Sequence, residues 1–242
     1  VKTKKTHKNG APNRPNPPPY FSGGGPNFPP RACGGYMDIG DIFKFLADDV
    51  HTVIAATADD EGLPVTCAID VMDYDGGGLY FLTAKGKGFY RRLMSRGYAA
   101  LTGIKGEDTM YRAAASVRGK VRPESEQKLA SLIQKNAYMR EIYPTEQSRA
   151  ALAAFCLYSG QAEWFDLSVK PIERLNLTFG GAAAEGGAYA VGGGCTSCGR
   201  CLEVCPQKCI KIGQRGAYIV QQNCLRCGNC TTVCPVGAVT RG

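Results

Sequence analysis

The chain has 242 residues, of which 44% are hydrophobic, enough for one packed core and a small second domain. Its formal net charge is +8, but residues 1–36 hold six Lys/Arg and no acid, which leaves 23 basic against 21 acidic residues elsewhere. A nearly neutral body excludes the broad basic face of a nucleic-acid-binding protein. The sequence has no apolar run long enough to span a membrane and no secretory signal pattern, so we expect a cytoplasmic protein.

Composition divides the chain into four segments. Residues 1–36 contain eight of the fourteen prolines and cannot build a packed core, which predicts a disordered basic tail. Regular patterns then predict a domain over residues 37–180. A glycine-rich linker over 181–194 and a cysteine-rich domain over 195–242 complete the chain.

Residues 37–180 read mainly as strands joined by short Asp/Gly turns. Apolar spacing predicts helices over 41–50, 89–96 and 124–138. The predicted strands cover 51–58, 63–72, 79–83, 99–104, 114–122, 155–166 and 173–179. The fold class is therefore mainly β with helices, an antiparallel barrel with helical decoration.

Nine of the twelve cysteines lie between residues 195 and 234. They include two runs of the form Cys-x2-Cys-x2-Cys-x3-Cys-Pro, over 195–206 and 224–235, offset by 29 residues at every position. Dense, short-spaced cysteines without a secretory signal indicate metal binding rather than disulfides. Structural zinc prefers pairs of Cys-x2-Cys, so the duplicated run favours iron–sulfur clusters.

The two runs resemble those of two-cluster bacterial ferredoxins, over about residues 186–242. The resemblance implies a small α+β domain with two [4Fe–4S] clusters, in which the last cysteine of each run crosses to the other cluster. Its ligand sets would be Cys195, Cys198, Cys201 and Cys234 for one cluster, and Cys205, Cys224, Cys227 and Cys230 for the other. Cys209 has no cysteine counterpart in the second run, and we expect it to be a buried core residue.

A second pattern lies in residues 79–93, where a strand delivers Thr83 and Lys85 to its end and Lys87 stands at a helix start. A hydroxyl, two ammonium groups and free helix N–H groups predict a phosphate site. The alternative is a Lys-rich solvated turn. With residues 62–66 and 163–165, this segment resembles the FMN-binding split barrel of the pyridoxamine 5′-phosphate oxidase-like family, over roughly residues 40–180.

The resemblance implies FMN at a homodimer interface, with its phosphate on Thr83, Lys85 and Lys87. Its ring would lie along Pro64, Val65 and Thr66. Arg118 adds a phosphate contact, or else belongs to a solvated strand face. The oxidase's substrate-phosphate residues have no counterpart near the C-terminus, which is replaced by the cysteine-rich domain, so oxidation of pyridoxamine phosphate is not expected. The only tryptophan, Trp164, is expected in the core.

Together these features predict a flavin/iron–sulfur oxidoreductase of anaerobic-type metabolism. The clusters would exchange single electrons with a redox partner, and FMN would couple them to a two-electron step at a small-molecule acceptor. The barrel has one histidine, His51, and no nucleophilic triad or GxGxxG fingerprint, so no catalytic residue is assigned. Two alternatives stay open: an electron carrier without its own substrate, and a flavin-based redox sensor that uses the basic tail as its partner contact.

Overall fold

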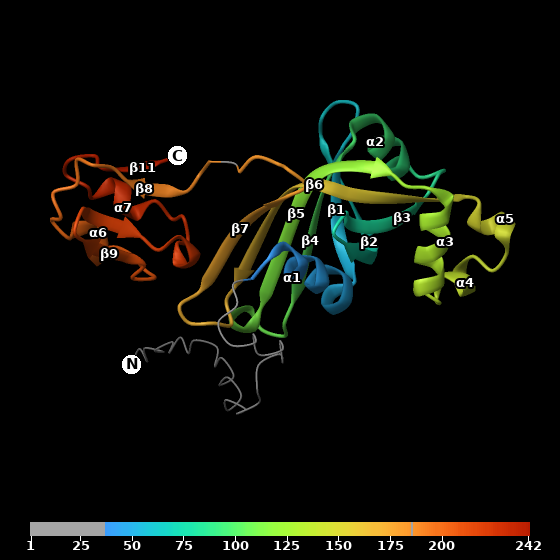
Figure 1. The fold of residues 1–242 in the computed structure, drawn as a ribbon, viewed down its shortest axis with the longest axis horizontal. Helices are drawn as coiled ribbons and strands as arrows, with labels where there is room; N and C mark the ends of the chain where they lie inside the picture. Colours follow the sequence, from blue (N-terminus) through green and yellow to red (C-terminus); the bar gives the residue numbers. More distant parts are fainter. Residues whose placement is uncertain (1–36, 185) are drawn as a thin grey trace, which may run out of the picture.

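The structure is a computed structural model that describes residues 37–184 and 186–242, so the predicted tail lies outside the described residues. A mainly β part is followed along the chain by a small cysteine-rich part, the cysteine domain (Figure 1). Within the described residues, no helix has the length and apolar character needed to cross a membrane.

Seven antiparallel strands form one sheet in the order β3-β2-β1-β4-β5-β6-β7. Pairing of β3 with the first half of β6 closes six strands into a barrel, and β7 pairs with the second half of β6. The strands are β1 (Thr52–Ala58), β2 (Pro64–Asp75), β3 (Gly78–Ala84), β4 (Tyr98–Lys105), β5 (Ala113–Pro123), β6 (Leu152–Asp166) and β7 (Glu173–Phe179). The predicted mainly β barrel is confirmed.

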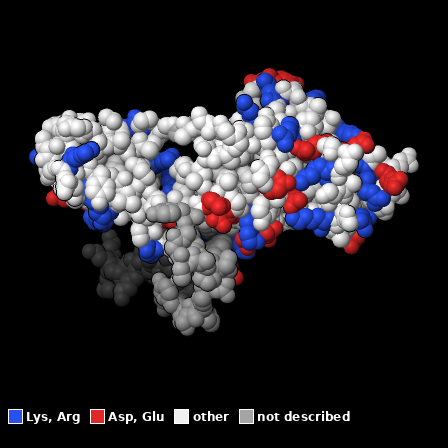
Figure 2. All heavy atoms as spheres, in the orientation of Figure 1, with Lys and Arg blue, Asp and Glu red and all other residues white. Residues whose placement is uncertain are grey.

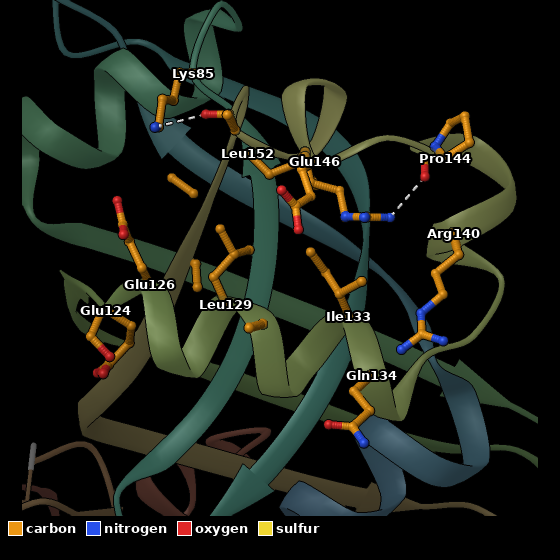
Figure 3. Close-up of a pocket in the computed structure, with 16 residues that line it drawn as sticks. Lys85, Glu124, Glu126, Leu129, Ile133, Gln134, Arg140, Pro144, Glu146 and Leu152 are labelled. Carbon is orange, nitrogen blue, oxygen red and sulfur yellow. Dashed lines mark hydrogen bonds between the residues drawn. The ribbon is translucent and has the colours of Figure 1, made fainter.

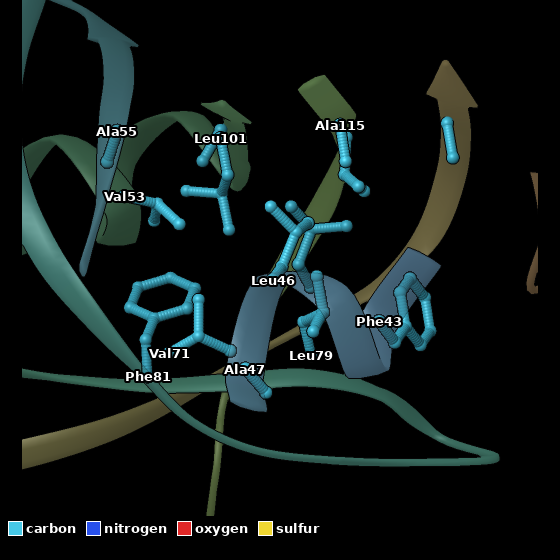
Figure 4. Close-up of a cluster of buried hydrophobic side chains, with 14 of the residues drawn as sticks. Phe43, Leu46, Ala47, Val53, Ala55, Val71, Leu79, Phe81, Leu101 and Ala115 are labelled. Carbon is cyan, nitrogen blue, oxygen red and sulfur yellow. The ribbon is translucent and has the colours of Figure 1, made fainter. Parts of the chain in front are cut away.

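Alternation along the strands fills the barrel interior. In β5, Ala115 and Val117 are buried whereas Ser116 and Arg118 face outward, the period of two that a half-buried strand requires. Figure 4 shows the resulting core, in which Phe81 and other apolar side chains converge from several strands. Phe81 stacks on Phe155 of the paired strand with ring centroids 5.9 Å apart.

Helices and short helical turns precede the first barrel strand and connect several of the others. They are α1 (Ile39–Lys44), the π-helical η1 (Phe45–Val50), α2 (Gly88–Arg96), the 3-10 turn η2 (Thr109–Tyr111), α3 (Glu126–Lys135), α4 (Met139–Ile142) and α5 (Glu146–Arg149). A capping box between Asp38 and Asp41 starts α1. The predicted helix over 41–50 widens into η1, which packs on β4: a Cβ at Gly103 would lie 2.7 Å from Leu46 Cδ2. Glycine therefore permits this close approach.

Trp164 is 3% exposed and meets Phe45 edge-on, with ring centroids 4.8 Å apart. Its predicted place in the core is confirmed. A second buried cluster lies beneath α3 and includes Met72 and Tyr80 from the sheet with Leu132 and Ile133 from the helix. This cluster fixes the segment α3 to α5 against β2 and β3, where that segment forms the wall of two grooves described below.

The cysteine domain consists of short elements: β8 (Tyr189–Val191), α6 (Arg200–Glu203), β9 (Ile210–Gly213), β10 (Gly216–Ile219), the 3-10 turn η3 (Gln221–Asn223), α7 (Asn229–Thr232) and β11 (Val239–Arg241). β9 pairs with β10, and β8 pairs with β11. β8 lies inside the segment predicted as a linker, because its pairing with the last strand gives its backbone groups partners.

Candidate functional site

Two cavities in the cysteine domain are each lined by four of the predicted ligands. The first, here the 195 cavity, is lined by Cys195, Cys198, Cys201 and Cys234. The second, here the 224 cavity, is lined by Cys205, Cys224, Cys227 and Cys230. They hold about 330 and 340 Å³ of space not filled by atoms, part of it open to solvent. Each cavity therefore takes three cysteines from one run and the last from the other.

The duplication of the sequence is also a duplication of backbone conformation. Ser197 and its counterpart Arg226 have φ of 57° and 56°, and Gly199 and Gly228 have φ of 79° and 82°. Each glycine precedes a short helix, α6 or α7, that carries the third cysteine of its run. Left-handed residues at these positions turn the chain tightly enough for three consecutive cysteines to line one cavity.

Backbone N–H groups point at the sulfurs of the cavities. Ala217 N donates to Cys195 Sγ at 3.3 Å, and Ala238 N donates to Cys234 Sγ at 3.2 Å. Backbone hydrogen bonds, that of Val236 first, lower the pKa of Cys234. Burial acts against ionisation of Cys205, but backbone N–H groups, led by that of Cys209, lower its pKa below the usual value. These donors favour the thiolate form that metal ligation requires.

At other cysteines of the domain, burial outweighs the backbone hydrogen bonds and raises the pKa. It raises the pKa of Cys201 and Cys230, which lie on α6 and α7. Cys209 also lines the 224 cavity, and its sulfur lies 3.4 Å from the sulfur of Cys205. Burial is the largest of the effects that raise the pKa of Cys209 to about 12. It is 4% exposed, in agreement with its expected place in the core.

The donor set fits an iron–sulfur cluster better than a single ion. In residues 37–184 and 186–242, no group of three or more His, Cys, Asp or Glu side chains gathers as ligands of one metal ion do. The four cysteines of each cavity instead surround a space, as ligands of the four separate irons of a cubane must.

A groove in the barrel part, here the barrel groove, contains two of the three predicted phosphate residues. Thr83, which is 5% exposed, and Lys87 line it together with residues 67–70 of β2 and the start of α4. Lys87 is the N-cap residue of α2, a nine-residue helix that begins at Gly88. A hydroxyl, an ammonium group and a helix start thus lie in one groove of about 1030 Å³, part of it open to solvent.

Lys85 lies in a different groove, the outer groove, between the end of β3 and the segment α3 to α5. Its Nζ donates to the carbonyl of Ala150 at 2.9 Å, and Figure 3 shows this bond together with Leu129 and Ile133 of α3 and the nearby Arg140. The structure therefore does not bring Lys85 together with Thr83 and Lys87. Lys85 closes the end of β3 against the start of β6.

Of the other predicted flavin residues, Thr66 and Arg118 lie in one row of the sheet. Thr66 is opposite Ala56, which is opposite Ala100, which is opposite Arg118. Three strand spacings of about 4.8 Å place Arg118 about 14 Å from Thr66. Arg118 donates to Gln161 Oε1 at 2.9 Å on the outer face of the sheet. Pro64, Val65 and Thr66 begin β2, just before the residues 67–70 that line the barrel groove.

The structure adds a polar network that sequence reasoning missed. Tyr138 lines the barrel groove and donates from its hydroxyl to Asp70 Oδ2 at 2.8 Å. His51 Nε2 lies 3.2 Å from the same hydroxyl, and burial raises the pKa of Tyr138. His51 has φ of 63°, a conformation that L residues rarely adopt and that collects at functional sites. The one feature of the sequence that marks His51 is that it is the single histidine of the barrel.

Comparisons with known proteins found one matching family model and a set of solved structures of low similarity. Residues 194–238 match the family model described as 4Fe-4S dicluster domain. No curated protein matches the chain.

The solved structures similar to this chain include three with informative descriptions. A heme binding protein from Mycobacterium smegmatis is 13% identical, covers 60% of this chain and 59% of its own, and has a TM-score of 0.47. A general stress protein 26-related protein of the pyridoxinephosphate oxidase family from Clostridium acetobutylicum is 14% identical. The match covers 59% of this chain and 96% of that protein, with a TM-score of 0.46. A pyridoxamine 5′-phosphate oxidase-related, FMN binding protein from Nostoc punctiforme is 13% identical. The match covers 55% of this chain and 85% of that protein, with a TM-score of 0.43. The barrel assignment itself rests on the strand pairing described above.

Proposed function

We propose that this chain is a flavin/iron–sulfur oxidoreductase that holds two [4Fe–4S] clusters and FMN and passes electrons between them and a small-molecule acceptor. The observation that carries the proposal is the presence in one chain of two four-cysteine cavities and a groove with a phosphate-type corner. The cysteines of the 195 and 224 cavities would hold one cluster each. A redox partner protein would exchange electrons with them.

FMN would bind in the barrel groove. Thr83, Lys87 and the first N–H groups of α2 would hold its phosphate, and the β2 segment that begins at Pro64 would lie along its ring. Bound FMN supplies the conversion between one-electron and two-electron transfer. The acceptor would take two electrons and two protons, and Tyr138 would hold one of these protons on its hydroxyl oxygen. Because Nδ1 of His51 faces the carbonyl of Ala47, His51 would replace that proton through Nε2 in its protonated form, which takes the proton from solvent.

The distance along β6 between the phosphate corner and the cysteine domain bears on how a homodimer would transfer electrons. Thr83 is opposite Ala153 and Arg174 is opposite Phe165, twelve positions apart on β6. At about 3.4 Å per residue, the phosphate corner and the start of β7, where Arg174 contacts Leu225 of the cysteine domain, lie about 40 Å apart along that strand. The ring, and not the phosphate, exchanges electrons, and at a homodimer interface it would reach toward the second copy. We propose that the clusters of one chain serve the flavin of that copy.

The outer face of β1 and β4 suits such a second copy. Ile54 and Ile104 are 53% and 59% exposed there, beside the small side chains of Ala56 and Ala100. Burial of exposed isoleucines against another molecule is favourable, and small neighbours allow close approach of a flat sheet.

Mixed dimers test the proposal. One chain carries Thr83→Val and Lys87→Ala, to lose FMN, and the other carries Cys195→Ala and Cys224→Ala, to lose both clusters. We expect reduced clusters to bleach the single flavin of the mixed dimer, whereas neither parent homodimer shows this transfer. Iron and flavin analyses confirm the loading of each chain. A correctly loaded mixed dimer whose flavin stays oxidised contradicts transfer between chains.

The electron-carrier alternative is distinguished by turnover. A carrier without a substrate needs no space beside its flavin, whereas an enzyme must admit a substrate next to the FMN that would fill the barrel groove. Turnover of nitro compounds, enones or free flavins by the reduced protein is the expected result, and retention of all electrons in their presence would favour the carrier.

A further inference from the structure

The cysteine domain lies beside β7 (Figure 1), and three hydrogen bonds between described residues join it to the chain at the start of that strand. Ile172 N donates to Gln207 Oε1 at 3.2 Å, and Asn223 Nδ2 donates to the carbonyl of Ile172 at 3.1 Å. Arg174 Nη1 donates to the carbonyl of Leu225 at 3.2 Å. A short stretch of β7 thus contacts two loops of the cysteine domain.

These three bonds all end next to ligands of the 224 cavity. Gln207 follows Cys205 by two residues, and Asn223 and Leu225 stand on either side of Cys224. Gln207 and Leu225 themselves line that cavity. The barrel therefore holds the cysteine domain by the loops that surround one particular cavity.

Arg174 is fixed from the barrel side as well. Its Nη2 donates to both carboxylate oxygens of Glu163 at 2.9 Å, across the β6–β7 pair, and its guanidinium lies 6.0 Å from the ring centroid of Phe165. Its side chain is 22% exposed. A planar guanidinium with two carboxylate bonds has a set orientation, so its remaining face is presented to Leu225 in a defined place.

This arrangement places a charge pair beside the loop of one cluster. The cation is the nearer member, because it bonds the carbonyl of Leu225, the residue after Cys224, and Glu163 lies behind it. Reduction adds one electron to a cluster that already carries four thiolates, so a nearby cation favours reduction and a nearby anion opposes it. The 195 cavity takes its cysteines from other loops.

We propose that Arg174, oriented by Glu163, is a positioning residue that docks the cysteine domain on β7 and raises the reduction potential of the cluster in the 224 cavity. The inference rests on the proposed two-cluster content and needs no flavin. It distinguishes the clusters: the one in the 224 cavity faces the barrel, and the one in the 195 cavity is free of this control.

The test is a dithionite redox titration of the anaerobically reconstituted full chain, followed by electron paramagnetic resonance. Arg174→Met leaves the Glu163 carboxylate unpaired and should lower the potential of one cluster only. Glu163→Gln leaves the guanidinium and should raise the potential of that same cluster. Arg174→Lys should fall between wild type and Arg174→Met. Arg122→Met, which breaks the Arg122–Glu124 pair at the α3 end of the barrel, is the matched control and should leave both potentials unchanged.

Ligand variants identify the cluster that responds. With Cys234→Ala, which empties the 195 cavity, Glu163→Gln should still shift the remaining cluster, and with Cys205→Ala it should not. Equal shifts of both clusters, no shift, or a shift of the cluster that survives Cys205→Ala would overturn the inference. A wild-type chain with fewer than two clusters would overturn the proposed function and this inference together, whereas two clusters with unchanged potentials would overturn the inference alone.

Discussion

The cysteine domain and the barrel hold their candidate sites in opposite ways. In the cysteine domain the candidate ligands form half of the core: four of the eight residues in its buried cluster are candidate ligands, accompanied by Cys209, Ile210, Ala217 and Val239. In the barrel, the core around Phe81 and Phe155 contributes the buried side chain of Phe89 to the barrel groove, and the predicted phosphate residues Thr83 and Lys87 do not belong to that core. Figure 2 shows a second contrast, since the cysteine domain displays Lys and Arg with scarcely any acid, whereas the α3 end carries both signs. Folding of the cysteine domain therefore depends on its clusters, whereas the barrel can fold without its cofactor.

Removal of iron should separate the two halves most strongly. A chelator with an oxidant should unfold residues 189–241, because so small an apolar core cannot hold the domain without its ligand bonds. The barrel should stay folded. Hydrogen exchange followed by mass spectrometry should show complete loss of protection over β8 to β11 and unchanged protection over β5 and β6. Equal loss in both halves, or none in the cysteine domain, would contradict this dependence.

Paired cysteine variants should show that each cluster is shared by both repeats. Cys205→Ala should remove one cluster, about half of the iron, because three ligands do not hold a cubane stably. Adding Cys224→Ala should remove no more iron, since both residues line the 224 cavity. Adding Cys201→Ala instead should remove the rest. The reverse pattern would mean that each run serves its own cluster.

The barrel groove should tolerate loss of its cofactor residues without unfolding. Lys87→Ala should weaken FMN binding about 10- to 100-fold, the value of one charge-assisted hydrogen bond of about 1.5–3 kcal/mol. Lys85→Ala is the matched variant and should weaken it less, because Lys85 Nζ bonds Ala150 in the outer groove. Quenching of flavin fluorescence measures both. Equal losses in the two variants would contradict the separation of the grooves.

The sequence predicts most where the structure is local. The cysteine cavities follow from a spacing that repeats every 29 residues, and the same left-handed turns recur at Ser197 and Arg226. The barrel strands follow from alternation and turn residues, within a few residues of their observed ends. Thr83 and Lys87 lie as expected at the end of β3 and the start of α2, because a strand, a turn and a helix start position them within five residues.

Contacts between distant segments had no such signal. The Lys85 backbone N–H donates to the carbonyl of Ala151, and this pairing carries Lys85 into the outer groove. Tyr138 reaches Asp70 across 68 positions, and it stands beyond the observed end of α3, although the predicted helix over 124–138 included it. Arg174 appeared only as one residue of a predicted strand, and its partner Leu225 belongs to the other domain. Long-range packing determines the positions of these residues, and a single sequence does not reveal which distant segments pack together.

In the proposed function, one chain holds and reduces both kinds of cofactor. An anaerobic reductive titration of the reconstituted full chain, followed by visible absorption, measures how many electrons they take up. We expect an uptake of about four electrons per chain, two by the flavin and one by each cluster, with bleaching of flavin and iron–sulfur bands. An uptake of about two electrons with no flavin bands after incubation with FMN would contradict it.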